Sequence, residues 1–151
     1  MDCLRSRRRS FFMQNFKRKG DTMWIYANPN PCRQEEPDCV VRAISLATGQ
    51  TWDKTHWDLC LLSHERCTMP SANWLWDIYL KQHGFEKFLL PESCPSCITV
   101  EKFCQRFPNG TYIIGTGSHA VCIQSGNYMD AWDSGQEVPT YFYRKRGLKN
   151  G

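Results

Sequence analysis

The chemistry available to this sequence centres on Cys39, which stands at the start of a predicted helix. Asp38 is a suitable N-cap, and the apolar run behind it ends before Gly49, which predicts a buried helix over 39–48. A thiol in the first turn of a helix faces unpaired backbone N–H groups and the positive end of the helix dipole, which lower its pKa. Because Asp38 adds a negative charge that opposes the thiolate, Cys39 needs a cationic partner to act as a nucleophile.

His119 is the candidate partner, at the start of a predicted strand. It follows Gly115-Thr-Gly117-Ser, whose small residues leave room for a substrate backbone to approach. A thiol and an imidazole in contact form the nucleophile and general base of acyl transfer. The other histidines lie on helical or loop segments without comparable partners, and we expect them to be surface or packing residues: His56, His64 and His83.

A third group must accept the other ring N–H of His119 and orient the ring, and two acids are available. With a three-residue hairpin loop at 125–127, His119 falls opposite Asp133 and on the same face of the sheet. The same register pairs Asp130 with Cys122 on the opposite face. It therefore favours Asp133 as the third member of a triad and keeps Asp130 in reserve.

The other cysteines offer a second kind of chemistry. Cys94-Pro-Ser-Cys97 has a spacing that lets two thiolates reach one metal ion. Cys60 and Cys67, or Cys104, could complete a tetrahedral zinc site. A single CxxC is only half a site, and the separation of Cys60 and Cys67 exceeds that of a usual zinc knuckle, so we favour no metal and expect no cofactor.

The elements that must position these residues fall into a helical first half and a stranded second half. Further helices are predicted from a Thr51 cap through Leu62, from a Ser71 cap to Gly84, and from a Thr99 cap to Phe107. After Pro108-Asn-Gly110 the periodicity changes to short strands separated by glycine-containing turns. We expect these strands to form an antiparallel meander: 112–114, 119–124, 128–133 and 138–143. This order of elements predicts one α+β domain over 23–143.

Composition narrows the class of protein further. A chain of 151 residues with 41% hydrophobic content is typical of one globular domain. Eleven of the 19 Lys and Arg lie in 1–20 and 144–151, and we expect 1–22 to be a disordered basic extension or a misassigned start, and 144–151 a basic tail. Because this charge lies on predicted tails rather than on a folded face with aromatic residues, we do not expect a nucleic acid partner.

Two further features bear on the compartment. No apolar run approaches the length of about 18 residues that spans a membrane, so we expect no membrane partner. The cysteines number nine, an odd count in a chain larger than the usual disulfide scaffold, which favours the reduced cytoplasm over secretion.

The order of the candidate residues resembles that of papain-like and bacteriocin-processing-type cysteine peptidases, in which Gln, Cys, His and Asp follow one another. Here the order is carried by Gln34-Glu-Glu-Pro-Asp-Cys39, by Gly117-Ser-His119-Ala-Val and by the Asp-containing strand that follows. The chain is also similar to a group of small bacterial and phage proteins. The shared stretches are Asp-Cys-x-Val-Arg-Ala, Met-Pro-Ser, Cys-Pro-x-Cys and Tyr-x-Asp-x-Trp-Asp-Ser, which begin at Asp38, Met69, Cys94 and Tyr128.

The resemblance implies a papain-like α+β fold in which the helix of Cys39 packs on a C-terminal antiparallel sheet bearing His119 and the acid. It implies that Gln34 is a side-chain donor to the oxyanion, although Gln34 lies five residues before Cys39 where the family has six. Asp130-Ala-Trp resembles the Asn-Ser-Trp of the family and favours Asp130. The resemblance and the register argument thus leave the third member open.

We therefore expect a cysteine-dependent peptidase or amidase that acts through an acyl-enzyme on a peptide, an amide or a protein substrate. Two alternatives use the same residues differently. One is a catalytically silent papain-fold binding module, such as a phage factor that sequesters a host component. The other is a zinc-stabilised interaction domain built on the cysteine pairs.

Overall fold

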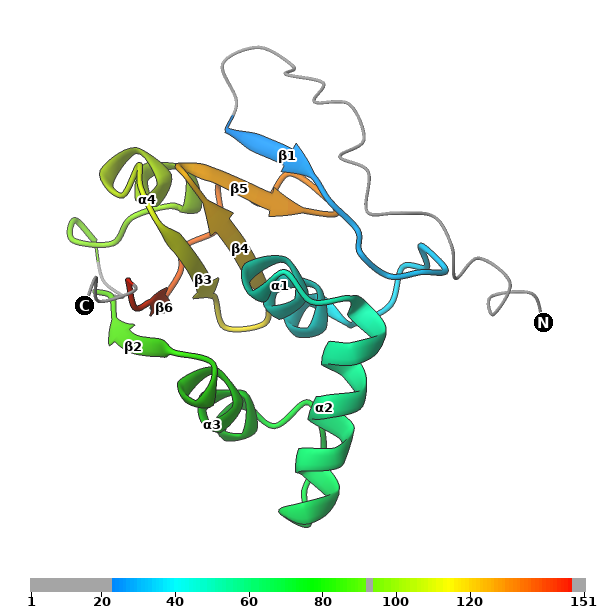
Figure 1. The fold of residues 1–151 in the computed structure, drawn as a ribbon. Coiled ribbons are helices and arrows are strands. Elements are labelled where there is room, and N and C mark those ends of the chain that lie inside the picture. Colours follow the sequence, from blue (N-terminus) through cyan, green and yellow to red (C-terminus); the bar gives the residue numbers. More distant parts are fainter. Residues whose placement is uncertain (1–22, 92–93, 148–151) are drawn as a thin grey trace.

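A computed structural model describes residues 23–91 and 94–147 of the chain, which form a mixed sheet with helices on its two faces (Figure 1). The predicted 1–22 extension and the end of the predicted basic tail lie outside the described residues. Within them, none of the helices is long and apolar enough to cross a membrane. In chain order the elements are β1 Trp24–Tyr26, α1 Cys39–Thr48, α2 Trp52–Glu65, α3 Asn73–Gln82, β2 Phe85–Leu89, α4 Val100–Arg106, β3 Thr111–Gly115, β4 Ala120–Gln124, β5 Asn127–Asp130 and β6 Tyr141–Lys145.

The four helices form where the sequence predicts them, because their end signals are local. α1 ends at Gly49, whose φ of 73° is the left-handed conformation that glycine adopts without strain. The Thr51 side chain accepts the Lys54 N–H at 3.2 Å, and the Thr99 side chain caps α4 in the same way. The prediction that Ser71 caps α3 is wrong, since that helix begins at Asn73 and Ala72 precedes it.

The predicted antiparallel meander is wrong, although its four strands are present. Across the sheet the strands run β1-β5-β4-β3-β6-β2, so that β6 lies between β3 and β2 rather than beside β5. β1 adds a parallel strand to β5, and the remaining pairs are antiparallel. β6 also continues to Lys145, so the start of the predicted tail at 144 belongs to the sheet. Local periodicity located these strands but carried no information on their partners.

The turn between β4 and β5 also differs from the prediction, and this changes the register. Gln124 pairs with Asn127, which leaves a two-residue loop instead of three residues. Ser125 and Gly126 have φ angles of 49° and 75°, the pattern of a type I′ turn. A positive φ is uncommon for serine, so the sequence Ser-Gly is a weak signal for this turn. The predicted pairing of Gln124 with Tyr128 is therefore shifted by one residue.

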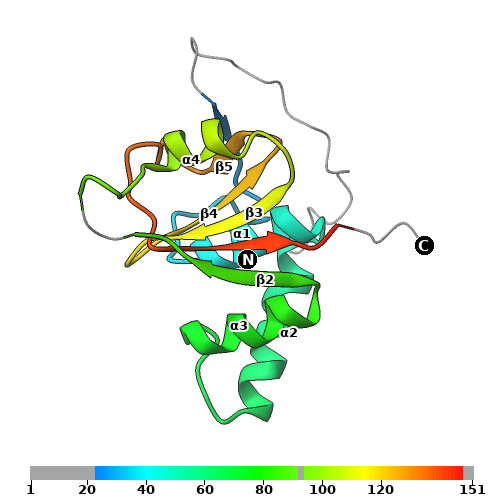
Figure 2. The ribbon, with the colours of Figure 1, turned by 90° about the vertical axis from the view of Figure 1, so that its left-hand side faces the viewer.

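The sheet separates two hydrophobic clusters, because alternate strand residues point to opposite faces. On one face lie α1, α2 and α3, packed on Ile113, Ala120 and Cys122. On the other face, α4 packs on Tyr112, Ile114 and Val121. Figure 2 shows α4 on one side of the sheet and α3 on the other. α1 contacts β4, β3 and β5, and its first residue, Cys39, interacts with the backbone N–H of Ala120 at the start of β4.

Candidate active site

Cys39 is the first residue of α1 and is half-buried against the sheet. Its thiol interacts with two groups at the start of β4, the His119 side chain and the Ala120 backbone N–H. The long apolar face of α1 fixes this approach, since Ile44 and Ala47 are buried in the same cluster as Ala120. The structure therefore brings together the thiol and the imidazole that the sequence selected.

His119 is buried and connects the thiol to a carboxylate. Its Nε2 lies 2.6 Å from Asp130 Oδ2, which leaves Nδ1 to face the Cys39 thiol. The Ser134 hydroxyl donates to Asp130 Oδ2 at 2.7 Å, and the Ala131 N–H donates to Asp130 Oδ1 at 2.7 Å. With these donors in place, Asp130 fixes the ring of His119 and favours its protonated form.

The register argument for Asp133 as the third member is wrong in its geometry. β4 begins only at Ala120 and β5 ends at Asp130, and their paired residues run from Gln124–Asn127 to Cys122–Met129, so the strand register reaches neither His119 nor Asp133. Asp133 instead accepts hydrogen bonds from the Tyr128 hydroxyl and, at 3.2 Å, from the Gly135 N–H. Asp133 thus holds the loop after β5, and Asp130 lies beside the imidazole.

Arg42 is the main site residue that the sequence did not single out. It is buried on α1 and pairs with Asp38 one turn earlier, while its guanidinium lies 3.8 Å from Asp130. Asp38 also accepts from Asn30 Nδ2 at 2.9 Å and from Trp52 Nε1 at 2.8 Å. The Asp38 side chain therefore does not cap α1, and Arg42 neutralises the charge that was expected to oppose the thiolate. The i, i+4 spacing of an acid and an arginine was the available signal.

Trp132 covers the imidazole. Its ring stacks on His119 with centroids 4.2 Å apart and planes at 27°, and the Arg42 guanidinium lies 5.7 Å from the indole centroid. One face of the indole remains open, since Trp132 is 46% exposed. The indole thus shields the His119 and Asp130 pair from water while it forms part of the outer surface.

The environment shifts the pKa values of Cys39 and His119 in opposite directions. Burial raises the pKa of the Cys39 thiol, but the hydrogen bonds with His119 and the Ala120 N–H, with the charges of His119 and Arg42, bring it below its ordinary value. Burial opposes protonation of His119, but hydrogen bonds to Asp130 and Cys39 outweigh it and raise the pKa to about 9. Near neutral pH these shifts favour a thiolate and imidazolium pair.

Gln34 does not join this arrangement. Its side chain is exposed in the segment before α1, and no hydrogen bond joins it to Cys39 or His119 within the described residues. The resemblance to papain-like peptidases assigned Gln34 to the oxyanion, and the structure does not place it at the thiol.

The cysteine pairs do not assemble into one metal centre. Cys94 Sγ and Cys97 Sγ lie 2.9 Å apart in the segment before α4. Cys60 lies on α2, where its sulfur is 3.7 Å from His56 Nε2, and Cys67 is exposed after that helix. Across residues 23–91 and 94–147 no three His, Cys, Asp or Glu side chains cluster as metal ligands. The four-cysteine site that the zinc alternative requires is not formed there.

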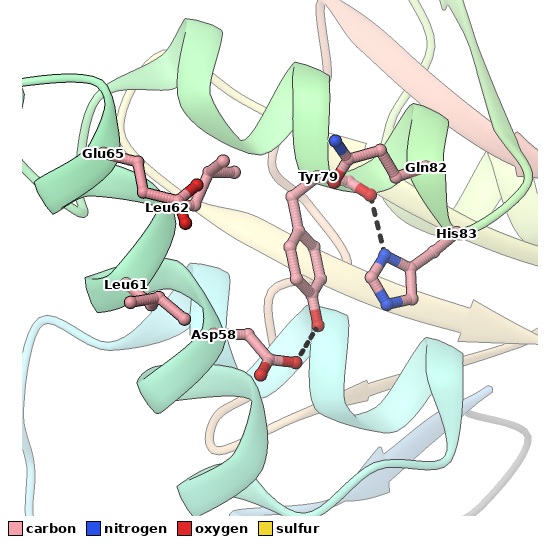
Figure 3. Close-up of a pocket in the computed structure, with 7 residues that line it drawn as sticks. All are labelled: Asp58, Leu61, Leu62, Glu65, Tyr79, Gln82 and His83. Atoms are coloured by element: carbon pink, nitrogen blue, oxygen red, sulfur yellow. Dashed lines mark hydrogen bonds between the residues drawn. The ribbon is translucent and has the colours of Figure 1, made fainter.

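A pocket lies between α2 and α3, away from Cys39 (Figure 3). The Tyr79 hydroxyl donates to Asp58 Oδ2 at 3.0 Å in this pocket, and the His83 ring lies against Tyr79 at a centroid distance of 4.0 Å. His56 likewise stacks on Trp52, and His64 is exposed. The prediction that the other histidines are surface or packing residues is confirmed.

Comparisons with known proteins found no family model, no curated protein and no solved structure that matches this chain. The geometry around Cys39 is therefore the evidence on which a function can be argued. That geometry consists of a buried carboxylate, an imidazole and a thiol in one hydrogen-bonded chain.

Proposed function

We propose that this protein is a papain-like cysteine hydrolase that cleaves a peptide or related amide bond. The observation that carries the proposal is the continuous chain from Asp130 through His119 to Cys39, with the two ring nitrogens facing different partners. The order Cys, His, Asp along the sequence, with the cysteine at the start of a helix and the histidine directly before a strand, supports a papain-like arrangement. The buried supports of Asp130 indicate a preorganised site.

The reaction follows from the protonation states. The Cys39 thiolate attacks the substrate carbonyl carbon, and the C=O electron pair moves to the oxygen. When the tetrahedral intermediate collapses, protonated His119 donates its proton to the leaving amine, and the acyl group remains on sulfur. Neutral His119 then removes a proton from water, whose oxygen attacks the thioester and releases the carboxylic acid. Asp130 stabilises the imidazolium in each half of this cycle.

Labelling tests the reactive pair first. Iodoacetamide at pH 6, followed by peptide mass analysis, is expected to modify Cys39 faster than Cys67, although Cys67 is more exposed. His119→Ala should remove this preference, because the thiol loses its cationic partner. His64→Ala is the matched control, since His64 is exposed on α2 and should leave labelling unchanged.

Turnover tests the hydrolase directly. A mixed library of peptide amides and p-nitrophenyl acetate supply generic acyl donors, and intact mass should reveal an acylated Cys39 that disappears with time. Fast labelling without any acylation would instead identify a binding module with a reactive thiol. Equal labelling of Cys39 and Cys67 in the unmodified protein would contradict the hydrolase.

A further inference from the structure

One hydroxyl near Cys39 has no role in the chain described above. Tyr141 is the first residue of β6, and it pairs with Gly115 of β3, which in turn pairs with Ala120 of β4. These three residues thus form one row across the sheet, on the face that α1 covers. The Ala120 N–H at the end of this row interacts with the Cys39 thiol.

The Tyr141 ring extends along this row toward the thiol. A methyl group at Gly115 would lie 2.1 Å from Tyr141 Cζ and 2.4 Å from its hydroxyl oxygen, so the phenol end rests on the glycine. Neighbouring strands are about 4.8 Å apart. The hydroxyl over β3 is therefore about one strand spacing from Ala120 of β4 and the sulfur beside it. This approach requires glycine at position 115, because any side chain there would clash with the Tyr141 ring.

Packing holds the ring in place. Tyr143 contacts it edge-on at a centroid distance of 5.8 Å, Trp76 lies 6.5 Å away, and Lys87 Nζ is 4.6 Å from the ring centroid. These contacts involve the ring and leave the hydroxyl free. A group held in this way loses little additional freedom when it binds a developing charge.

The hydroxyl of Tyr141 is unusual among the tyrosines of the sheet and α3. Each of the buried tyrosines donates a hydrogen bond to an acceptor. The Tyr141 side chain is half-buried, and its hydroxyl has no acceptor within the described residues. The engaged pairs are Tyr79 with Asp58 and Gln50, Tyr112 with the Asn109 carbonyl, Tyr128 with Asp133, and Tyr143 with Asp77. The O–H is therefore a donor without an acceptor, on the face of the sheet against which Cys39 also packs.

We propose that the Tyr141 hydroxyl donates a hydrogen bond to the oxyanion of the tetrahedral intermediate formed on Cys39, in the role that Gln34 does not fill. The assignment rests on the proposed hydrolase function. The backbone N–H of Cys39, in the first turn of α1, is the second donor, because the first N–H groups of a helix have no acceptor within it. Burial, with the charges of Asp77 and Cys39, raises the pKa of Tyr141, so its proton is retained during the reaction.

Two reactions of the same sulfur separate this role from thiolate formation. Iodoacetamide alkylates the thiolate by displacing iodide at a saturated carbon, so no oxyanion forms. p-Nitrophenyl acetate acylates the thiolate through a tetrahedral oxyanion, which collapses to the thioester and releases p-nitrophenolate. Tyr141→Phe keeps the ring and removes the donor. We expect its acylation rate to fall by about 10²-fold while its alkylation rate changes by less than about twofold.

Tyr143→Phe is the control, because its hydroxyl is already bonded to Asp77 and should not affect acylation. Unchanged acylation in folded Tyr141→Phe would overturn the oxyanion role. An equal loss of alkylation and acylation would also overturn it, since the tyrosine would then act by positioning the thiol. Failure of the unmodified protein to label selectively at Cys39 would contradict the proposed function itself, which is a different result.

Discussion

At the scale of single residues, the two candidate acids Asp130 and Asp133 have different partners. Asp130 binds His119, Ser134 and the Ala131 N–H, with Arg42 nearby, and is 3% exposed. Asp133, which is exposed, is bonded to Tyr128 and Gly135 in the adjacent loop. The two acids therefore have separable roles, one in the chemistry and one in the loop.

Alanine at each position should separate these roles. Asp130→Ala is expected to reduce kcat/KM for acylation by about 10²-fold or more, because the imidazolium loses its stabilising partner. Asp133→Ala should change kcat/KM little but lower the free energy of unfolding by about 1–3 kcal/mol, since the buried Tyr128 hydroxyl loses its acceptor. Urea denaturation and acylation kinetics measure both. The reverse pattern would restore Asp133 as the third member of the triad.

The protonation of His119 predicts the alkaline side of the pH profile. Because the raised pKa of His119 is about 9, the ring carries the proton needed by the leaving amine up to that pH and loses it above. Amide hydrolysis should therefore decline as the pH rises through about 9, whereas Cys39 alkylation should persist above it. On the acid side, alkylation of Cys39 should continue at pH values below the range in which an ordinary thiol titrates, because the pKa of Cys39 is lowered. A thiol titrating in its usual range would contradict this pairing.

At the scale of elements, α1 positions both the proposed nucleophile, Cys39, and a buried ion pair, Arg42 with Asp38. Arg42 and Asp38 form an i, i+4 pair that is 5% and 9% exposed, and Arg42 also faces Asp130. α2 carries an i, i+4 pair of similar spacing, Lys54 with Asp58, in which the lysine is 62% exposed. Burial distinguishes the two pairs, because a buried acid left without its partner is costly and an exposed one is hydrated.

These two pairs provide a matched test of stability. Arg42→Ala should lower the free energy of unfolding by about 3–5 kcal/mol, because it leaves the buried Asp38 carboxylate without its cationic partner. Lys54→Ala should cost less than about 0.5 kcal/mol. Denaturant titration of both variants measures the difference. Similar losses of unfolding free energy in the two variants would mean that Arg42 does not stabilise the buried acids.

The turn between β4 and β5 gives a second prediction at this scale, because it sets the register of two strands whose far ends adjoin the site. Ser125→Asn should raise the free energy of unfolding by about 0.5–1 kcal/mol, since asparagine adopts positive φ more readily. Gly126→Ala should lower it by more than about 1 kcal/mol, because alanine is strained at a φ of 75°. Neither should alter the chemistry of Cys39. Stabilisation by both changes would contradict a type I′ turn.

At the scale of the whole molecule, the site exists only when distant segments come together. Cys39 comes from α1, the imidazole and the Ala120 N–H from the start of β4, and Asp130 from the end of β5. The sheet order places β4 and β3 at its centre, with β6 alongside. The proposed reactivity of Cys39 therefore requires the folded domain.

This dependence can be measured in urea. The preference of iodoacetamide for Cys39 over Cys67 should disappear at the same urea concentration as the change in tryptophan fluorescence. The reason is that His119 and Ala120 are remote from Cys39 in sequence. Both therefore lose contact with its thiol when the sheet unfolds. Loss of preference well before the fluorescence transition would place the site in a locally unfolding segment.

The sequence by itself determined what depends on neighbouring residues. Helix caps, glycine stops and apolar periodicity located all four helices, and the position of Cys39 at a helix start and of His119 at a strand start followed from them. These signals are short-range interactions between the backbone and side chains a few residues away. These interactions are present in any tertiary arrangement that contains the same helix or strand.

Only the tertiary structure decided which of the candidates meet. Asp130 rather than Asp133 lies beside His119, because the two-residue turn shifts the register by one residue and the paired strands end before either His119 or Asp133 is reached. The places of Arg42 and Tyr141 beside the site depend on the packing of α1 on the sheet and on the pairing of β6 with β3. Strand order and side-chain contacts between remote segments depend on the packing of the whole core, which no local pattern encodes. The pairing of Cys39 with His119, and Asp130 as one of two candidate acids, were thus predictable from the chain, whereas the places of Arg42 and Tyr141 were not.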